Sequence, residues 1–383
     1  MSNLPDRSFG RGRLIGIESH HPAARAGWRI VWLRLSAHFL VKRCVNCLLQ
    51  PAPGTRSSQK SRPSCSNYMI TAPLINAMTV DVEDYFHVAG FADQFSPDQW
   101  ADFPSRVVAN THRLLRLMDH HQCLGTYFIL GWVADRFPQL VRDIQSAGHE
   151  IGCHSYWHRL IYDLTPDVFR QDLQQGCDSI QNITGEPVTL YRAPSFSIMH
   201  KSLWAFECLA EFGITADSSV YPVHHDRYGI PDADRAVHTV VTPAGNVDES
   251  PGTVASLAGL RLPAGGGGYF RLYLWWLTLH LVRQVTCQRP MMFYIHPWEV
   301  DPDQPRLSGS MLSRFRHYQN LKFAEPRLNR LLREFPFDAM SATLAAIPSA
   351  LPEYRPVRDR YCNPSEPAAQ SQHGNDLLAV TQF

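Results

Sequence analysis

Two histidines stand four residues apart in the segment His154-Ser-Tyr-Trp-His158. On one helical turn this spacing brings both imidazole rings to a single ion. An earlier apolar run ends in three acids within four residues, Asp81, Glu83 and Asp84. Two histidines and one carboxylate leave coordination positions free for water, which is the pattern of a catalytic metal site. The sequence therefore predicts a divalent metal, with zinc as the expected ion.

Either of two residues, Glu83 or Asp84, could supply the carboxylate ligand of this site. Side chains alternate between the two faces of a strand, which places Glu83 on the same side as Asp81. Asp84 reaches the same point only if the chain turns directly after the strand. The alternation favours Glu83 and leaves Asp84 as the alternative. A solvated turn would also accommodate three acids, but it would not explain the apolar run before them.

Five predicted strands end in a polar or titratable residue, and this coincidence is the strongest internal sign of a site. The residues are Asp81, His154, Arg192, Asp217 and His296. Parallel α/β folds gather catalytic residues at the carboxyl ends of their strands. We therefore expect these five side chains to lie at one edge of a sheet.

Strands and helices must alternate along the chain to place these residues together. Apolar runs predict strands at residues 75–81, 125–130, 150–153, 188–192, 214–217 and 291–295. Helical patterns occupy residues 138–147, 166–183 and 202–212. A further helix is capped by Ser105, and one face of it carries Val107, Thr111, Leu114 and Met118. This alternation predicts parallel βαβ units, and hence an α/β barrel or a doubly wound sheet.

Residues 225–290 interrupt the alternation with proline and glycine, and we expect them to form an insertion over the barrel mouth. Within them, Gly265–Gly268 is expected to be a flexible flap near the bound substrate and not a phosphate loop, because no Lys-Ser/Thr follows it. The apolar stretch Leu272–Val282 is too short to span a membrane and is expected to be a buried core helix. Residues 69–345 would then form one catalytic domain.

The chain divides by charge into two different parts. Residues 1–68 hold eleven Lys/Arg and two Asp/Glu, while the remainder holds 25 basic and 33 acidic residues. We interpret residues 1–68 as a basic, disordered extension, and we expect translation to begin at Met69 or Met78. Residues 346–383 are polar and rich in proline, which predicts a disordered tail. The hydrophobic content of 44% and charged content of 19% are ordinary for a globular enzyme.

The cysteines and the lack of targeting signals bear only on the redox state and the cellular location of the protein. Nine cysteines, an odd number scattered singly, favour reduced and buried thiols over a disulfide framework. The sequence shows no secretory signal pattern and no apolar run of about 18 residues. The expected location is the cytoplasm or the membrane periphery, without a transmembrane segment.

Four motifs resemble those of the polysaccharide deacetylases of carbohydrate esterase family four, the NodB-homology type. TVDVED resembles the first motif, HSYWH the second, RAPSF the third and YIHPWE the last. The stretches VDVEDYFHV, RAPSFSI, DSSVYP and GGGGYFRLY further resemble a subgroup linked to exosortase and exopolysaccharide clusters in Gram-negative bacteria. The family's first motif has two adjacent aspartates, whereas here the acid after Asp81 is displaced. This departure keeps the choice between Glu83 and Asp84 open.

The resemblance covers about residues 75–345 and implies a deformed (β/α) barrel. It also implies hydrolysis of N-acetyl groups on a polysaccharide or oligosaccharide, in exopolysaccharide biosynthesis. A divalent metal would polarise the acetamide carbonyl, Asp81 would take a proton from water, and Arg192 would hold Asp81 ionised through a forked hydrogen bond. His296 would protonate the departing amine, with Asp217 behind it or lining the site. Ser195 or its neighbours would offer a backbone N–H to the oxyanion.

Aromatic side chains beside the motifs suit the faces of a sugar ring. The expected substrate contacts, besides Ser195, are Tyr85, Trp157, Phe196 and Trp298. Two alternatives to a polysaccharide deacetylase are a small-amide amidohydrolase of the same fold and a catalytically inactive carbohydrate-binding protein. A nucleic-acid partner would require residues 1–68 to be ordered, and none is expected.

Overall fold

The computed structural model describes residues 74–92, 94–348, 350–357 and 360–362. The predictions for residues 1–68 and for the position of the start lie outside the described residues. Within the part of the chain that the structure describes, no helix is long and apolar enough to cross a membrane.

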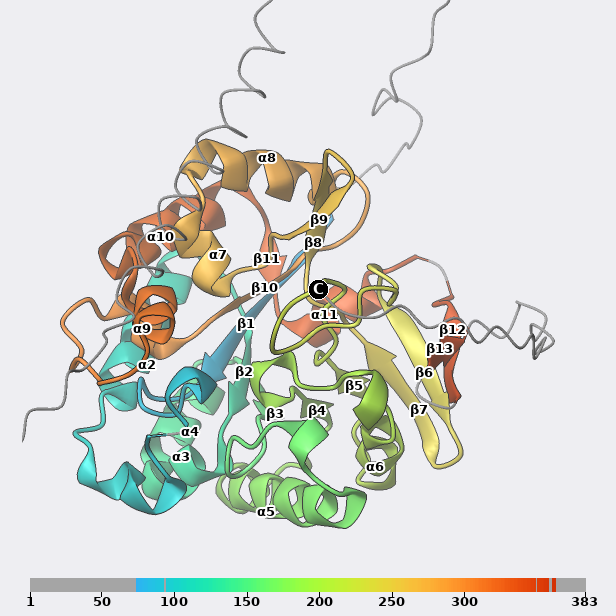
Figure 1. Ribbon diagram of the computed structural model, residues 1–383, viewed down its shortest axis with the longest axis horizontal. Helices are drawn as coiled ribbons and strands as arrows, with labels where there is room; N and C mark the ends of the chain where they lie inside the picture. The colour runs from blue at the N-terminus through green and yellow to red at the C-terminus, as the bar shows by residue number, and fades with distance from the viewer. Residues whose placement is uncertain (1–73, 93, 349, 358–359, 363–383) are drawn as a thin grey trace, which may run out of the picture. The chain divides into compact units, whose positions relative to one another are not determined.

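A mostly parallel sheet forms the centre of the described structure, and helices pack around it (Figure 1). Its hydrogen-bonded strands run in the order β10 (Met292–Ile295), β1 (Asn76–Val82), β2 (Thr126–Ile129), β3 (Glu150–Cys153), β4 (Leu190–Tyr191), β5 (Ala216–Asp217), β7 (Gly245–Glu249), β6 (His238–Thr242), β12 (Glu353–Val357) and β13 (Arg360–Cys362). A short strand, β11 (Phe337–Asp338), also pairs with β1. All pairs from β10 to β7 are parallel, which confirms the predicted α/β fold. The ladder of strands is not closed into a complete barrel.

The helices lie between the strands and cover the core. In the described residues they are α2 (Val107–His120), α3 (Gly131–Arg136), α4 (Pro138–Ser146), α5 (Pro166–Thr184), α6 (Ala205–Glu211), α7 (Gly267–Leu272), α8 (Trp275–Thr286), α9 (Met311–Tyr318), α10 (Ala324–Glu334) and α11 (Met340–Ala345). The predicted apolar face of α2 is buried at all four positions, Val107, Thr111, Leu114 and Met118. All seven residues of β1 are also buried, as expected for a parallel strand covered on both faces.

Residues 225–290 differ from the predicted insertion over the barrel mouth. Strand β7 pairs in parallel with β5, and β6 pairs with β7, so this hairpin extends the main sheet. A second hairpin, β8 (Val254–Leu257) with β9 (Leu260–Pro263), forms a sheet of its own. The parts that do face the functional pocket are His225, Arg227, Tyr228 and helix α7.

The predicted flap at Gly265–Gly268 is instead packed against β10. The backbone N–H of Tyr294 donates a hydrogen bond to the Gly265 carbonyl, and Gly266 forms a parallel bridge with Tyr294. A Cβ atom on Gly266 would lie 2.0 Å from the Tyr294 carbonyl oxygen. Gly265 and Gly266 are therefore required for the close approach of two backbones, and this part of the predicted flap is instead packed on β10.

Within the disordered tail predicted for residues 346–383, the structure shows two strands, and residues 363–383 lie outside the described residues. Strand β12 pairs in parallel with β6 at the edge of the main sheet, and β13 pairs with β12 in the antiparallel sense. Polar, proline-containing strands are common at sheet edges, where one side of the ladder faces solvent. A polar, proline-containing composition therefore does not distinguish an edge strand such as β12 from a disordered region.

Candidate active site

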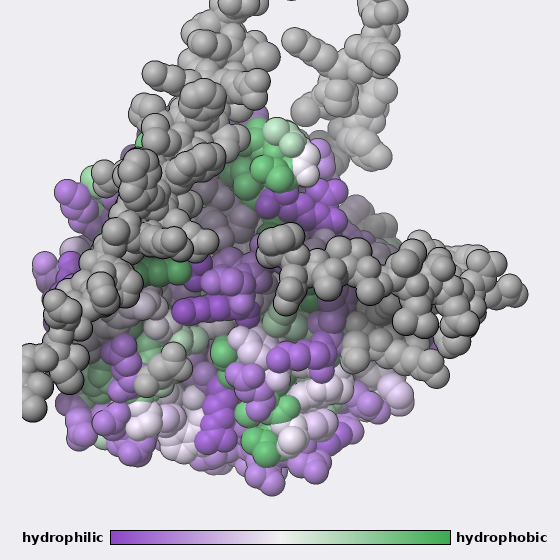
Figure 2. All heavy atoms as spheres, viewed as in Figure 1, coloured by the Kyte–Doolittle hydropathy of each residue, from purple (hydrophilic) through white to green (hydrophobic). Residues whose placement is uncertain are grey.

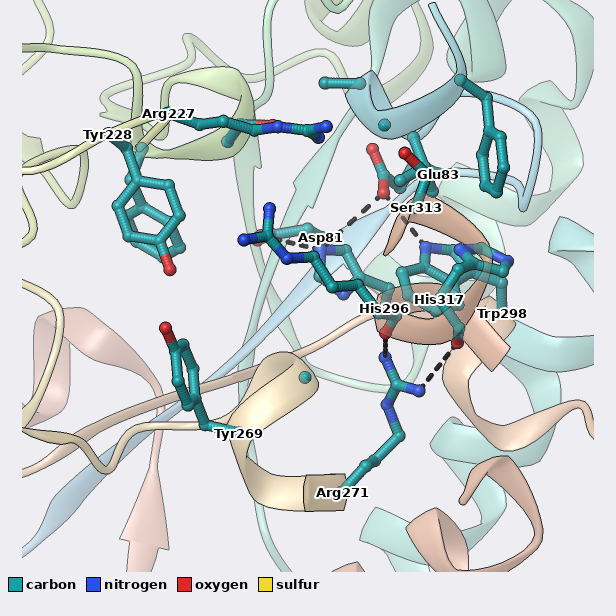
Figure 3. A pocket seen from close by; sticks show the side chains of 18 of the residues that line it. Asp81, Glu83, Arg227, Tyr228, Tyr269, Arg271, His296, Trp298, Ser313 and His317 are labelled. Atoms are coloured by element: carbon teal, nitrogen blue, oxygen red, sulfur yellow. Dashed lines mark hydrogen bonds and ion pairs between the residues drawn. The ribbon is translucent and has the colours of Figure 1, made fainter. Parts of the chain in front are cut away.

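A pocket of about 410 Å³ opens at the carboxyl ends of the central strands. Asp81 lies near the end of β1, His154 directly follows β3, and His296 directly follows β10. In Figure 3, Asp81, Glu83 and His296 point toward one another at the bottom of the pocket, while Tyr228 and Tyr269 lie on its opposite side. Three strand ends predicted to meet therefore do meet, as parallel βαβ topology requires.

Glu83, His154 and His158 form the group in this pocket that suits a metal ion. All three are buried, and their ligand atoms lie within 4.8 Å of one another. His158 Nε2 is 2.6 Å from Glu83 Oε2, yet Oε2 accepts no hydrogen bond in the described structure. A buried carboxylate oxygen that is short of partners and faces two imidazoles fits a divalent cation such as zinc.

The geometry between the two histidines is a turn and not the helical turn inferred from their spacing. Ser155 and His158 both adopt left-handed backbone angles, with φ of 65° and 52°. Asp172 of α5 holds this turn, because its carboxylate accepts hydrogen bonds from the backbone N–H groups of Tyr156 and Trp157. Asp172 was not identified from the sequence, and no local pattern links it to the histidine pair.

The pKa values of His154 and Glu83 are both lowered, which favours the forms of these side chains that bind a cation. Burial lowers the pKa of His154 to about 4, so its ring is neutral at neutral pH and keeps a free lone pair. Its Nδ1 lies 2.8 Å from the Arg192 carbonyl oxygen, which leaves Nε2 to face the pocket. Burial alone would raise the pKa of Glu83, but His158, His296 and His154 outweigh it, and the pKa is lowered.

Glu83 and Asp84 are separated by their partners. Glu83 Oε1 accepts a hydrogen bond from the Trp298 indole at 3.1 Å, while Oε2 faces the histidines. Asp84 Oδ2 accepts from the backbone N–H groups of Arg106 and Val107, at 2.8 and 3.1 Å, and from the Ser105 hydroxyl. Asp84 therefore caps the first turn of α2, the role predicted for Ser105. The structure places Glu83, and not Asp84, among the candidate ligands.

The two carboxylates should give opposite results on substitution. Asp84→Ala should lower the free energy of unfolding by about 2–4 kcal/mol, because two buried N–H groups lose their acceptor. Glu83→Gln should leave the metal-free stability nearly unchanged and abolish stoichiometric metal binding. Urea unfolding of the metal-free proteins and metal analysis of the loaded ones measure both effects. Metal loss from folded Asp84→Ala, with retention by Glu83→Gln, would reverse this assignment.

Arg192 is fully buried and holds Asp81 in place. Its Nη1 donates to Asp81 Oδ1 and to the Thr79 hydroxyl, each at 2.7 Å, and its Nη2 donates to the Ser218 hydroxyl. The guanidinium also lies 4.4 Å from the ring centre of Phe128. The contact with Asp81 is a single hydrogen bond and not the predicted fork. This charge-assisted hydrogen bond orients the Asp81 carboxylate.

His296 belongs to a buried chain of charges that sequence reasoning missed. Its Nε2 lies 3.8 Å from Asp81 Oδ2, and its Nδ1 lies 2.8 Å from Glu299 Oε1. Arg271 of α7 donates from Nε to Glu299 Oε2 at 2.6 Å. Burial would lower the pKa of His296, but the hydrogen bond to Glu299 and nearby carboxylates raise it to about 9. The i, i+3 spacing in His296-Pro-Trp-Glu299 was the available signal for this pair.

Glu299→Gln should move the alkaline limb of the pH–rate profile to lower pH. A group that donates a proton is active only below its pKa, and the amide no longer stabilises protonated His296. Rates measured from pH 6 to pH 10 test this, with metal content checked in parallel. Glu334→Gln, at a surface ion pair with Arg330, is the matched control and should leave the limb in place. An unmoved limb in Glu299→Gln would exclude His296 as the proton donor.

The remaining predicted residues divide between the pocket and the core. Ser195, Phe196 and Trp298 line the pocket, whereas Tyr85 and Trp157 do not. Tyr85 is fully buried, and Trp157 packs against Trp100. Aromatic residues next to a motif are drawn into the core when their side of the turn faces inward. The backbone role predicted for Ser195 stays a prediction.

Asp217 lies in the core and not behind His296. Its carboxylate accepts from the Ser219 hydroxyl at 2.7 Å, and that hydroxyl accepts from the Ala193 backbone N–H. Burial raises the pKa of both Asp217 and its neighbour Glu249, so the pair tends to retain a proton. Asp217 therefore stabilises the loop after Arg192 through Ser219, and it does not line the pocket.

Comparison with known proteins finds similarity to polysaccharide deacetylases over part of this chain. The family model "Polysaccharide deacetylase" matches residues 99–214, and a domain of unknown function, DUF3473, matches residues 218–345. A peptidoglycan-N-acetylglucosamine deacetylase of Bacillus cereus is 30% identical over 98 residues, which are 25% of this chain and 36% of that protein. The peptidoglycan-N-acetylmuramic acid deacetylase PdaA of Bacillus subtilis is 31% identical over 84 residues, 22% of this chain and 32% of that protein.

The matched regions span about a third of the length of these curated relatives. A crystal structure from Mycobacterium smegmatis, of a protein assigned only provisionally as a polysaccharide deacetylase, has 21% identity and a TM-score of 0.49. It covers 78% of this chain and 97% of that chain. This chain is therefore similar to the polysaccharide deacetylase model over residues 99–214, and to the two deacetylase relatives over 98 and 84 residues.

Proposed function

We propose that this protein is a metal-dependent hydrolase that removes N-acetyl groups from a polysaccharide. The observation that carries the proposal is the meeting of Glu83, His154 and His158 in one pocket with Asp81 and His296. Two carboxylates and three imidazoles, all at strand ends, suit hydrolysis better than simple sugar binding. The resemblance to exosortase-linked proteins and the peptidoglycan deacetylases among the relatives favour an N-acetylated bacterial polymer, with an exopolysaccharide as our first choice.

The residues divide the reaction between a base and an acid. A divalent ion, with zinc expected, would supply a Lewis acid for the amide carbonyl and acidify water. Asp81, held in place by Arg192, would take the proton from the attacking water. His296, kept protonated by Glu299, would give a proton to the departing nitrogen. Water adds to the amide carbon, the C–N bond breaks, and the products are acetate and a free amino sugar.

The direct test is acetate release from a panel of N-acetylated oligosaccharides, with the chelated protein and the zinc-reconstituted protein compared. Chelation should abolish release and zinc should restore it. A small-amide amidohydrolase would instead turn over cyclic or short amides and ignore the oligosaccharides. A carbohydrate-binding protein would bind the oligosaccharides and release no acetate under any metal condition.

A further inference from the structure

Large exposed hydrophobic side chains are concentrated in one stretch of this chain. The described residues expose nine, and eight of these fall between residues 260 and 323: Leu260, Leu272, Leu274, Trp276, Met311, Leu312, Phe315 and Phe323. The ninth is Leu124. Single exposed apolar residues are ordinary, but a concentration of them marks an interaction site. Figure 2 shows hydrophobic atoms gathered over α8 on the face in view.

Six of these residues form what we call the mouth patch, defined as Leu272, Leu274, Trp276, Met311, Leu312 and Phe315. Arg271 joins its two halves, because its guanidinium donates to the carbonyls of His317 and Gln319 at the end of α9. Leu272, Leu312 and Phe315 also line the functional pocket. The mouth patch therefore lies at the entrance of the candidate active site.

The start of α8 was expected to be buried, and the structure shows why it is not. The helix buries one face through Thr278, Leu281, Val282 and Val285. Trp276 lies on the opposite side of the helix and Leu274 is its N-cap residue, and each is 57% exposed. Apolar side chains that the core does not bury are unfavourable in water. We therefore expect the exposed apolar residues at the start of α8 to serve a function.

The segments that carry the mouth patch are rich in positively charged residues, of which Arg316 pairs with the exposed Asp226 and Arg283 with Glu334. Residues 250–298 and 304–324 contain eight Arg/Lys and no Asp or Glu. Residues 69–249 and 325–383, in contrast, contain 17 basic and 30 acidic residues. The three acids between the two stretches include Glu299 and Asp301, which are buried and paired with Arg271 and Arg106. The mouth patch is thus the basic region of an otherwise acidic body.

We propose that the mouth patch docks on the surface of an anionic phospholipid bilayer, so that the pocket opens onto the membrane. On α9, Arg314 stands between Leu312 and Phe315, which suits apolar insertion next to anionic headgroups, whereas Arg316 is paired with Asp226. Exposed Trp276 is of the type that prefers the bilayer interface. Electrostatic repulsion between the acidic remainder and the lipid would set the orientation. This docking does not depend on the reaction that the pocket performs.

The first test is co-sedimentation of the full-length protein with phosphatidylcholine vesicles, with and without phosphatidylglycerol. The triple variant Leu274→Ser/Trp276→Ser/Met311→Ser, in which no changed residue lines the pocket, should bind anionic vesicles about 100-fold more weakly. Arg314→Gln should weaken binding about fivefold. Leu124→Ser and Arg142→Gln, exposed and outside the mouth patch, should leave binding unchanged.

A local readout is needed because residues 1–68 are strongly basic and would themselves attract anionic lipid. Brominated lipids quench tryptophan fluorescence only on contact. Vesicles that contain them should quench wild-type emission more than that of Trp276→Phe. Vesicle binding without this difference, or full binding by the triple variant, would overturn the proposal. So would a wild-type dimer that the triple variant loses, because the mouth patch would then be a self-association surface.

Discussion

His154→Ala should lose both its metal and its deacetylation activity, with a rate loss beyond about 10⁴-fold, the upper range for removing one positioned proton-transfer group. The imidazole is buried, held by the Arg192 carbonyl and neutral at neutral pH, so a metal ion would lose one of only three protein ligands. Two remaining ligands do not bind a zinc ion tightly.

Metal stoichiometry and acetate release, measured on the same preparation, test this expectation. His120→Ala is the matched control, because His120 is exposed at the end of α2 and should leave both quantities unchanged. Stoichiometric metal in a His154→Ala/His158→Ala double variant would end the proposal that these side chains are ligands. The proposed chemistry of the pocket would then need a different metal site or none.

Asp81→Asn should retain its metal and release acetate about 10²–10⁴-fold more slowly. The amide keeps the shape of the carboxylate and its contact with Arg192, but it cannot accept a proton. Arg192 is tied to Thr79 and Ser218 as well as to Asp81, so the surrounding structure should hold. The expected effect is on the turnover rate, with little change in metal affinity or in KM.

The measurement is metal content beside kcat and KM for Asp81→Asn and for Asp178→Asn, an exposed aspartate of α5. The control should behave like the wild type. Metal loss in Asp81→Asn would make Asp81 a ligand and would leave the base unassigned. An unchanged kcat would exclude Asp81 as the base, and Glu83 would be the next carboxylate to test.

What the sequence by itself determined about this protein is what local patterns encode. Alternating runs of apolar residues and helical periodicity predicted the α/β fold and the buried face of α2, because burial acts on neighbouring residues of one element. The strand-end rule brought Asp81, His154 and His296 to one pocket for the same reason, since parallel strands share an edge.

Only the tertiary structure decided which partner each side chain takes. Glu83 and Asp84 are adjacent in sequence, yet one faces the histidines and the other caps a helix that begins 23 residues later. Arg271 and Glu299, which connect to His296, are 28 residues apart in the sequence. No local sequence pattern therefore predicts their contact. Gly265–Gly268 has the composition of a flexible loop and instead permits close packing on β10. Such contacts depend on how distant segments pack, and packing is a property of the whole chain.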